Sequence, residues 1–213
     1  MRNTKLGSGI SFPRRARGAL LIMAASALVA RRAVAQSATD APSAVLRSGT
    51  LSFDGHATVG DFVGSTTTMS GSFTGDVAAA RGWVEAPVAT LQTKNDHRDR
   101  DLRGSMEVTK YPTMRFDLER VQIRSTTPQG ADVLLHGSLT IHGVKRDVAL
   151  PAIVARDADT TRVTSVFPLD LADYHIGGLT KMLGLLRMNP KIEVHVDLRF
   201  VDETSRLPNS RGT

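Results

Sequence analysis

The chain has 213 residues, with 27 Lys and Arg, 21 Asp and Glu, and a formal net charge of +6. Seven of these cations and no acid lie in residues 1–35, so 20 cations and 21 acids remain, and the rest of the chain carries a net charge of −1. The part after the leader therefore gives no electrostatic reason to expect nucleic-acid binding. Because the chain has no cysteine, disulfides, iron–sulfur clusters, Cys-attached haem and thiol nucleophiles are excluded.

The first 35 residues have the organisation of an export signal. Three arginines (Arg14, Arg15 and Arg17) precede the apolar run 19–30, and Ala33-Val-Ala35 follows it. A run of 12 residues is well short of the roughly 20 that cross a bilayer. We therefore expect a signal peptide over residues 1–35 that is cleaved after Ala35. The pair Arg14-Arg15 leaves both the twin-arginine and the Sec export routes open.

The remaining residues are enough for one domain with a core of its own. Residues 36–47 are rich in Ala, Ser and Pro, and we expect a flexible linker there. Residues 48–203 are expected to form the folded domain, and the patternless residues 204–213 a disordered tail.

Alternating apolar and polar residues predict β-strands throughout this domain. Such segments are Met69–Phe73, Met114–Ile123, Leu135–Ile141, Val148–Leu150, Val163–Leu171 and Ile192–Phe200. The apolar phase changes between Leu118 and Val121, which predicts a bulge near Glu119-Arg120 in a curling strand. Gly143 supplies the turn of a hairpin between 135 and 150. About eight such segments separated by short turns favour a closed antiparallel barrel, since closure removes exposed sheet edges.

Two segments break the alternation. Asp96 precedes Arg100, and Asp99 precedes Arg103, each by four residues and in the favourable acid-first order. This predicts a short helix over 95–103 that ends at Gly104. A second short helix or helical lid is predicted over 179–188, where Leu179, Met182, Leu183 and Leu186 form one apolar stripe.

The charged turn Lys94-Asn-Asp-His-Arg-Asp-Arg-Asp-Leu-Arg103 is followed by Lys110-Tyr-Pro-Thr-Met-Arg-Phe116 and by the hairpin His136-Gly-Ser-Leu-Thr-Ile-His-Gly-Val-Lys-Arg-Asp-Val-Ala-Leu150. In this order, over roughly residues 49–201, the chain resembles the YceI-like family. The resemblance implies an all-β, lipocalin-like antiparallel barrel of about eight strands with one or two short helices. It also implies a bacterial protein, periplasmic or secreted, whose interior holds a polyisoprenoid or similar lipid.

The apolar residues can form either an ordinary core or the wall of a ligand tunnel. With the resemblance, ten of them become expected ligand contacts: Phe62, Phe73, Trp83, Met106, Met114, Phe116, Phe167, Tyr174, Met182 and Leu183. Methionines suit an irregular apolar ligand because their side chains are flexible and polarizable. The resemblance further implies that the charged turn and residues 179–188 border the mouth, where Arg98, Arg103 or Lys181 could meet a polar headgroup.

Neither a metal site nor a catalytic residue is expected. The six histidines have no paired helical spacing, and His136 and His142, on one polar strand face, lie too far apart to share an ion. His97 stands among acids, which we interpret as a helix-surface salt-bridge cluster.

The sequence leaves three functions open. The first is a non-catalytic carrier of a polyisoprenoid, quinone-like or fatty-acyl molecule that needs no cofactor. The second is a lipid-modifying enzyme with His97 and its neighbouring acids as base, and the third is a filled barrel that binds another protein. Transient contact with a membrane surface and homodimerisation also stay open.

Overall fold

The computed structural model describes residues 44–58, 60–128, 130–177, 180–181 and 186–203, with only the backbone for 180–181 and 186–187. Every described residue belongs to one compact unit of the chain, which lies within residues 39–213. Its elements are β1 (Ala44–Ala57), β2 (Gly60–Thr66), β3 (Ser70–Thr74), η1 (Val77–Ala79), β4 (Arg81–Pro87), η2 (Val88–Thr90), α1 (Asp96–Ser105), β5 (Thr113–Thr127), β6 (Gly130–Ile141), β7 (Val144–Asp157), β8 (Thr160–Asp170), η3 (Leu171–Tyr174), β9 (Thr180–Lys181), β10 (Leu186–Arg187) and β11 (Lys191–Asp202).

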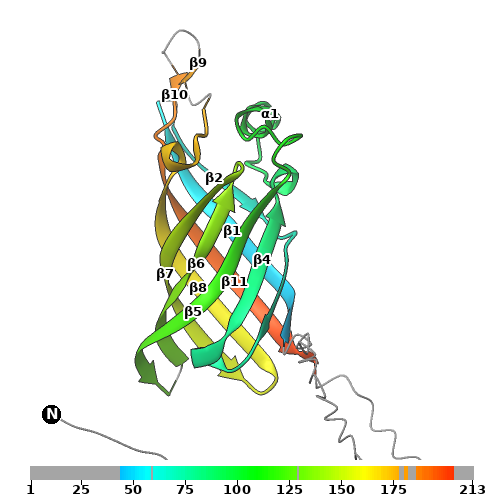
Figure 1. Cartoon of the computed structure of the whole chain (residues 1–213). Coiled ribbons are helices and arrows are strands. Elements are labelled where there is room, and N and C mark those ends of the chain that lie inside the picture. Colours follow the sequence, from blue (N-terminus) through cyan, green and yellow to red (C-terminus); the bar gives the residue numbers. More distant parts are fainter. Residues whose placement is uncertain (1–43, 59, 129, 178–179, 182–185, 204–213) are drawn as a thin grey trace, which may run out of the picture. The chain divides into compact units, whose positions relative to one another are not determined.

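An antiparallel sheet closes on itself to form a barrel (Figure 1). The strand order is β11-β8-β7-β6-β5-β4-β3-β1-β2, and pairing of β1 with β11 closes the ring. That closing ladder runs from Ala44 opposite Asp202 to Asp54 opposite Glu193. The expected all-β barrel is confirmed, because closure pairs the edges that an open sheet of this width would expose.

Strands β2 and β3 follow each other along β1 and together occupy one strand position in the barrel wall. Leu51 of β1 lies opposite Thr66 of β2, and Ala44 lies opposite Phe73 of β3, so both pairings keep the same register. Residues 67–69 interrupt the ladder between them. The wall of the barrel therefore has eight strand positions, although nine strands take part in its sheet.

The predicted bulge and hairpin are both confirmed. The register between β5 and β6 shifts between Leu118 and Arg120, where the apolar phase of the sequence changes. Strands β6 and β7 pair up to Ile141 opposite Val144, so the connecting turn is the two residues His142 and Gly143. Both have positive φ, 51° and 73°, as a tight hairpin turn of the type I′ class requires.

Pairing between β7 and β8 covers only one end of the two strands. Their register runs from Ile153 opposite Thr164 to Asp157 opposite Thr160. Toward the other end, the Ser165 hydroxyl donates to the Pro151 carbonyl at 2.6 Å, and the Arg146 guanidinium donates to the Asp173 carbonyl of η3 at 2.7 Å. Part of the barrel wall is thus made by η3 and side chains rather than by a backbone ladder.

Three sequence expectations are corrected here. The helix α1 continues through Gly104 to Ser105 and does not end at the glycine. The expected linker reaches only to residue 43 at most, since 44–47 belong to β1 and pair with β11. The described part of 179–188 is a pair of strands, β9 and β10, with Lys181 opposite Leu186. A short apolar run does not distinguish helix from strand by itself, and here cross-strand pairing decides.

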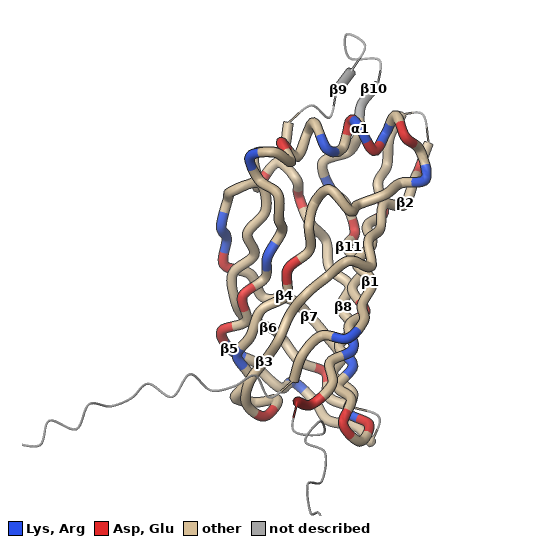
Figure 2. The backbone as a smooth tube through the Cα atoms, turned by 90° about the vertical axis from the view of Figure 1, so that its right-hand side faces the viewer, with Lys and Arg blue, Asp and Glu red and all other residues tan. Residues whose placement is uncertain are grey.

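Charges of both signs are spread over the described structure. Figure 2 shows Lys or Arg interspersed with Asp or Glu along α1 and over the barrel. This agrees with the near-zero charge calculated for residues 36–213. Among the described residues no helix is both long and apolar enough to span a membrane.

The hairpin turn and α1 supply a matched pair of glycine substitutions. We expect Gly143→Ala to lower the free energy of unfolding by about 1–2 kcal/mol or more, because φ is +73°. A Cβ there would also clash with the Tyr111 ring. Gly104→Ala, in helix with no atom within 4 Å of the added Cβ, should raise stability by up to about 1 kcal/mol. Urea unfolding of both variants measures this; destabilisation by Gly104→Ala would contradict the helical assignment.

Candidate ligand-binding cavity

The barrel encloses an apolar cavity of about 240 Å³ at the end covered by α1. Alternation along each strand turns one set of side chains toward this space, and closure brings the sets together. Its lining comprises Leu51, Phe53, Ala57, Thr58, Phe62, Leu91, Arg98, Asp101, Leu102, Ser105, Met106, Met114, Leu139, Ile141, Phe167, Leu169, Leu171, Ile176, Met188, Ile192 and Val194. Polar side chains are few and most of them come from α1.

One face of α1 forms part of the cavity wall. Arg98, Asp101, Leu102, Ser105 and Met106 all line the cavity, and their spacing is that of a single helical face. The Arg98 guanidinium lies 4.2 Å from the centre of the Phe62 ring, which fits a cation–π contact. This face therefore places a cation beside an aromatic ring at the cavity.

The start of α1 is anchored by polar contacts. The Asn95 side chain accepts hydrogen bonds from the backbone N–H groups of His97 and Arg98, at 3.1 and 3.0 Å, and caps the helix. The Asp99 carboxylate is buried and accepts from the Thr93 backbone N–H at 2.7 Å and its hydroxyl at 2.6 Å. The hydrogen bond from the Thr93 hydroxyl lowers the pKa of Asp99, because it favours the charged carboxylate.

His142 joins α1 to η3 from the hairpin turn. Its Nε2 lies 2.8 Å from Oε2 of Glu107, just after α1. Its Nδ1–H donates to the Tyr174 carbonyl at 3.1 Å. The centres of the His142 and Tyr111 rings are 4.5 Å apart. The side chain is buried, so the expectation that His142 lies on a polar strand face is wrong. It occupies the turn beyond the strand, where two other segments cover it.

A second, smaller cavity of about 100 Å³ lies toward the opposite end of the barrel. Its wall includes Phe73, Trp83, Leu118, Leu135 and Phe200, with Phe116 facing it from β5. Phe116 also packs against the apolar cluster that surrounds the larger cavity. Phe116 therefore stands between the two apolar spaces.

The residues expected to contact a ligand separate into four groups. Phe62, Met106, Met114 and Phe167 line the larger cavity, and Phe73, Trp83 and Phe116 line the smaller one. Tyr174 is buried in the cluster beside the larger cavity and is not part of either lining; its burial raises the pKa of its hydroxyl. Met182 and Leu183 lie outside the described residues.

The three cations expected at the mouth are also distributed. Arg98 lines the larger cavity, whereas Arg103 lies on another side of α1, beside Glu107 and Lys110. The side chain of Lys181 lies outside the described part of the chain.

Several lining residues were not among those expected. Phe53 of β1 lies opposite Val194 of β11 in the closing ladder, and both line the cavity. Leu51 of β1 and Ile192 of β11 line it as well. Alternation placed the β11 pair on an apolar face, but no local signal showed that this face met the cavity. The residues of α1 that face the cavity recur at helical spacing in the sequence, and this spacing could have predicted them. The helix was instead predicted from its charge pairs alone.

The helix-surface charges differ from the expected pairs. Arg100 donates to Nδ1 of the exposed His97 at 2.7 Å, and Asp99 is engaged by Thr93. His97 has no carboxylate within ion-pair distance among the described residues. The alternative of a His97-centred base therefore gains no geometric support.

With eight strand positions around an apolar cavity, this protein is a lipocalin-like antiparallel barrel. The profile of the YceI-like domain family matches residues 45–200, and the chain belongs to that family. The expected resemblance is thereby confirmed.

Solved structures show the same fold at low sequence identity. A polyisoprenoid binding domain from Saccharophagus degradans has a TM-score of 0.63 and 18% identity, over 76% of this chain and 99% of that one. BcnA from Burkholderia cenocepacia has a TM-score of 0.59 and 16% identity, covering 71% and 95%. The YCEI protein of Campylobacter jejuni has a TM-score of 0.53 and 21% identity, covering 66% and 84%. A comparison with curated protein sequences gives no match.

The Asp99 anchor predicts an acid-sensitive contribution to stability. Asp99→Ala removes the acceptor of two buried Thr93 donors and should cost about 1–3 kcal/mol of unfolding free energy at neutral pH. Since the folded pKa of Asp99 is lowered, its stabilisation is present above the ordinary Asp pKa and is lost as pH falls through the folded pKa. Chemical unfolding of wild type and variant from neutral to acid pH should therefore show a difference that shrinks as pH falls. A difference independent of pH would contradict the assigned role of the carboxylate.

Proposed function

We propose that this protein is an exported, non-catalytic carrier that encloses a polyisoprenoid, quinone-like or other long-chain lipid in the larger cavity. The observation that carries this proposal is the lining: aliphatic, aromatic and methionine side chains from the barrel wall, with a few polar side chains mostly on α1. The Saccharophagus degradans relative is described as a polyisoprenoid binding domain, which supports the same ligand class. Lipid binding by this chain rests on those two points together.

The energetics of such a site need few polar contacts. Each buried CH₂ contributes about 0.8 kcal/mol, so a chain of several methylenes gains substantial affinity from burial alone. Met106, Met114 and Met188 suit this role because a thioether side chain adapts to an irregular tail. Phe116 would limit how deep the tail reaches, since it separates the larger cavity from the smaller one.

Arg98 is the candidate contact for a polar headgroup. It lines the cavity while its guanidinium stacks on Phe62, so its charge sits at the apolar boundary without being fully buried. A carbonyl, hydroxyl or phosphate oxygen of a lipid would offer this guanidinium an acceptor.

The two alternatives from the sequence are less well supported. A lipid-modifying enzyme would need a base, and His97 is exposed and hydrogen-bonded to Arg100. A filled barrel is opposed by the two internal apolar cavities.

Adjacent residues of β8 allow a matched test of lipid binding. Phe167 lines the cavity, whereas its neighbour Val166 is 49% exposed on the outer face. We expect Phe167→Asp to abolish retention of lipid, because a charge beside an apolar tail costs several kcal/mol. Val166→Asp places the same charge on the same strand and should retain lipid as wild type does. Mass spectrometry of organic-solvent extracts of the purified proteins measures the bound lipid.

Both variants are first checked for folding by circular dichroism, because a buried charge can unfold a core. If Phe167→Asp does not fold, Phe167→Ser provides a milder polar replacement in the same wall. A folded cavity variant that carries the wild-type amount of lipid would refute the cavity assignment.

The proposed export predicts a defined mature protein. Residues 1–35 carry the basic start, the short apolar run and the Ala33-Val-Ala35 sequence of a signal peptide. Expressed in a bacterium, the chain should appear in the periplasmic fraction with an intact mass that begins at Gln36. A product that retains Met1 in the membrane fraction would identify the apolar run as an anchor. Replacing Ala33 and Ala35 with bulky residues should block processing.

A further inference from the structure

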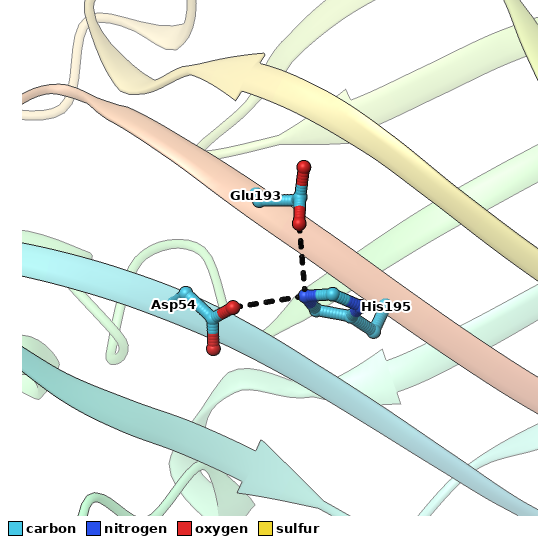
Figure 3. A group of neighbouring side chains, drawn as sticks. All are labelled: Asp54, Glu193 and His195. Atoms are coloured by element: carbon cyan, nitrogen blue, oxygen red, sulfur yellow. Dashed lines mark hydrogen bonds and ion pairs between the residues drawn. The ribbon is translucent and has the colours of Figure 1, made fainter.

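Three potential metal ligands meet on the outer face of the barrel. Asp54 is on β1, and Glu193 and His195 are on β11 (Figure 3). Antiparallel pairing places Asp54 opposite Glu193, and His195 is one side-chain position farther along the same face. Phe53 and Val194, the residues next to them, line the internal cavity. The cluster is therefore separated from the lipid cavity by the thickness of the wall.

The spacing of the donor atoms fits a small divalent cation. Nε2 of His195 lies 3.0 Å from Oδ2 of Asp54 and 3.5 Å from Oε1 of Glu193. One ligand atom from each residue lies within 4.8 Å of the others. In a tetrahedral zinc site with bonds of about 2.0–2.1 Å, neighbouring ligand atoms are about 3.3–3.4 Å apart. The two distances from the imidazole bracket that value.

The charge of the cluster also calls for a cation. Two carboxylates converge on a single imidazole nitrogen, which carries at most one proton and can satisfy only one of them fully. Within the described residues, no Lys or Arg nitrogen lies within ion-pair distance of Asp54 or Glu193. With a neutral imidazole the cluster has a charge of −2, and two exposed valines border it, Val63 opposite Asp54 and Val166 opposite His195.

We propose that Asp54, Glu193 and His195 form a binding site for a zinc-class divalent cation, with solvent completing the coordination. One imidazole and two carboxylates suit Zn²⁺, whereas Mg²⁺ and Ca²⁺ prefer oxygen ligands alone. A bound ion would connect β1 to β11, the two strands that close the barrel, through residues far apart in the chain. Since it would bind the folded state, it would raise the unfolding midpoint.

This proposal replaces the expectation that no metal ligands converge. That expectation compared histidines with one another along the sequence, but the closing ladder brings an aspartate of the first strand to a histidine of the last. The His56 side chain offers a contrast, because it has an ion-pair contact to the single carboxylate of Asp61, at 2.8 Å.

The test is a titration of the full chain, without a polyhistidine tag, with Zn²⁺. Isothermal titration calorimetry should give one equivalent bound, and saturating Zn²⁺ should raise the thermal midpoint by several degrees, reversibly with chelator. His195→Ala and Asp54→Asn should each weaken Zn²⁺ binding at least tenfold. His136→Ala is the matched control and should bind as wild type does. His136 is also a strand histidine, but its Nε2 meets the Gln122 amide, and within the described structure no carboxylate lies at ion-pair distance from it.

Ca²⁺ in place of Zn²⁺ should produce no comparable shift. Circular dichroism confirms that each variant is folded, and Glu193→Gln substitutes for any that is not. Absence of Zn²⁺ binding by wild type would overturn the proposal, as would equal affinity in the cluster variants and in His136→Ala. Lipid content is measured on the same samples and should be unchanged, so this proposal can fail while the carrier function stands.

Discussion

Pairing of β1 with β11 closes the sheet into a barrel, and both cavities and the outward cluster of Asp54, Glu193 and His195 follow from that closure. It removes the two open edges of the sheet, and it forces one face of every strand inward. Phe53 then lies opposite Val194 in the ladder, and both become cavity wall together with Leu51 and Ile192. A barrel of this size can fill its interior or leave space, and two apolar cavities remain here.

The same ladder gives the two faces of the wall different chemistry. Inward residues of β1 and β11 are apolar and surround the proposed lipid site, while Asp54, Glu193 and His195 face outward. Because side chains alternate along a strand, neighbouring residues serve unrelated sites only one position apart. Substitutions at one face can therefore be compared with controls at the next residue, as for Phe167 and Val166.

The cover of the larger cavity depends on a few buried polar contacts. Asp99 holds the start of α1 to Thr93, and His142 meets both Glu107 after the helix and the Tyr174 carbonyl of η3. These contacts align one helical face, with Arg98 and Met106, over the cavity. An isolated helix of 10 residues would be marginal in water, so its position comes from these tertiary contacts.

Features that depend on near neighbours in the chain were predictable from the sequence. Period-two alternation gave the strands, the phase change at Glu119-Arg120 gave the bulge, and Gly143 gave the hairpin turn. The helix predicted over 179–188 is wrong for residues 180–181 and 186–187, which are strands, because a short apolar run fits a helix and a strand equally well. Three features became known only from the folded barrel: which residues face each cavity, that Arg98 rather than Arg103 borders one of them, and that Asp54 meets His195. These features depend on barrel closure, which brings together residues from the two ends of the domain. A local sequence pattern contains no information about contacts between residues so far apart in the chain.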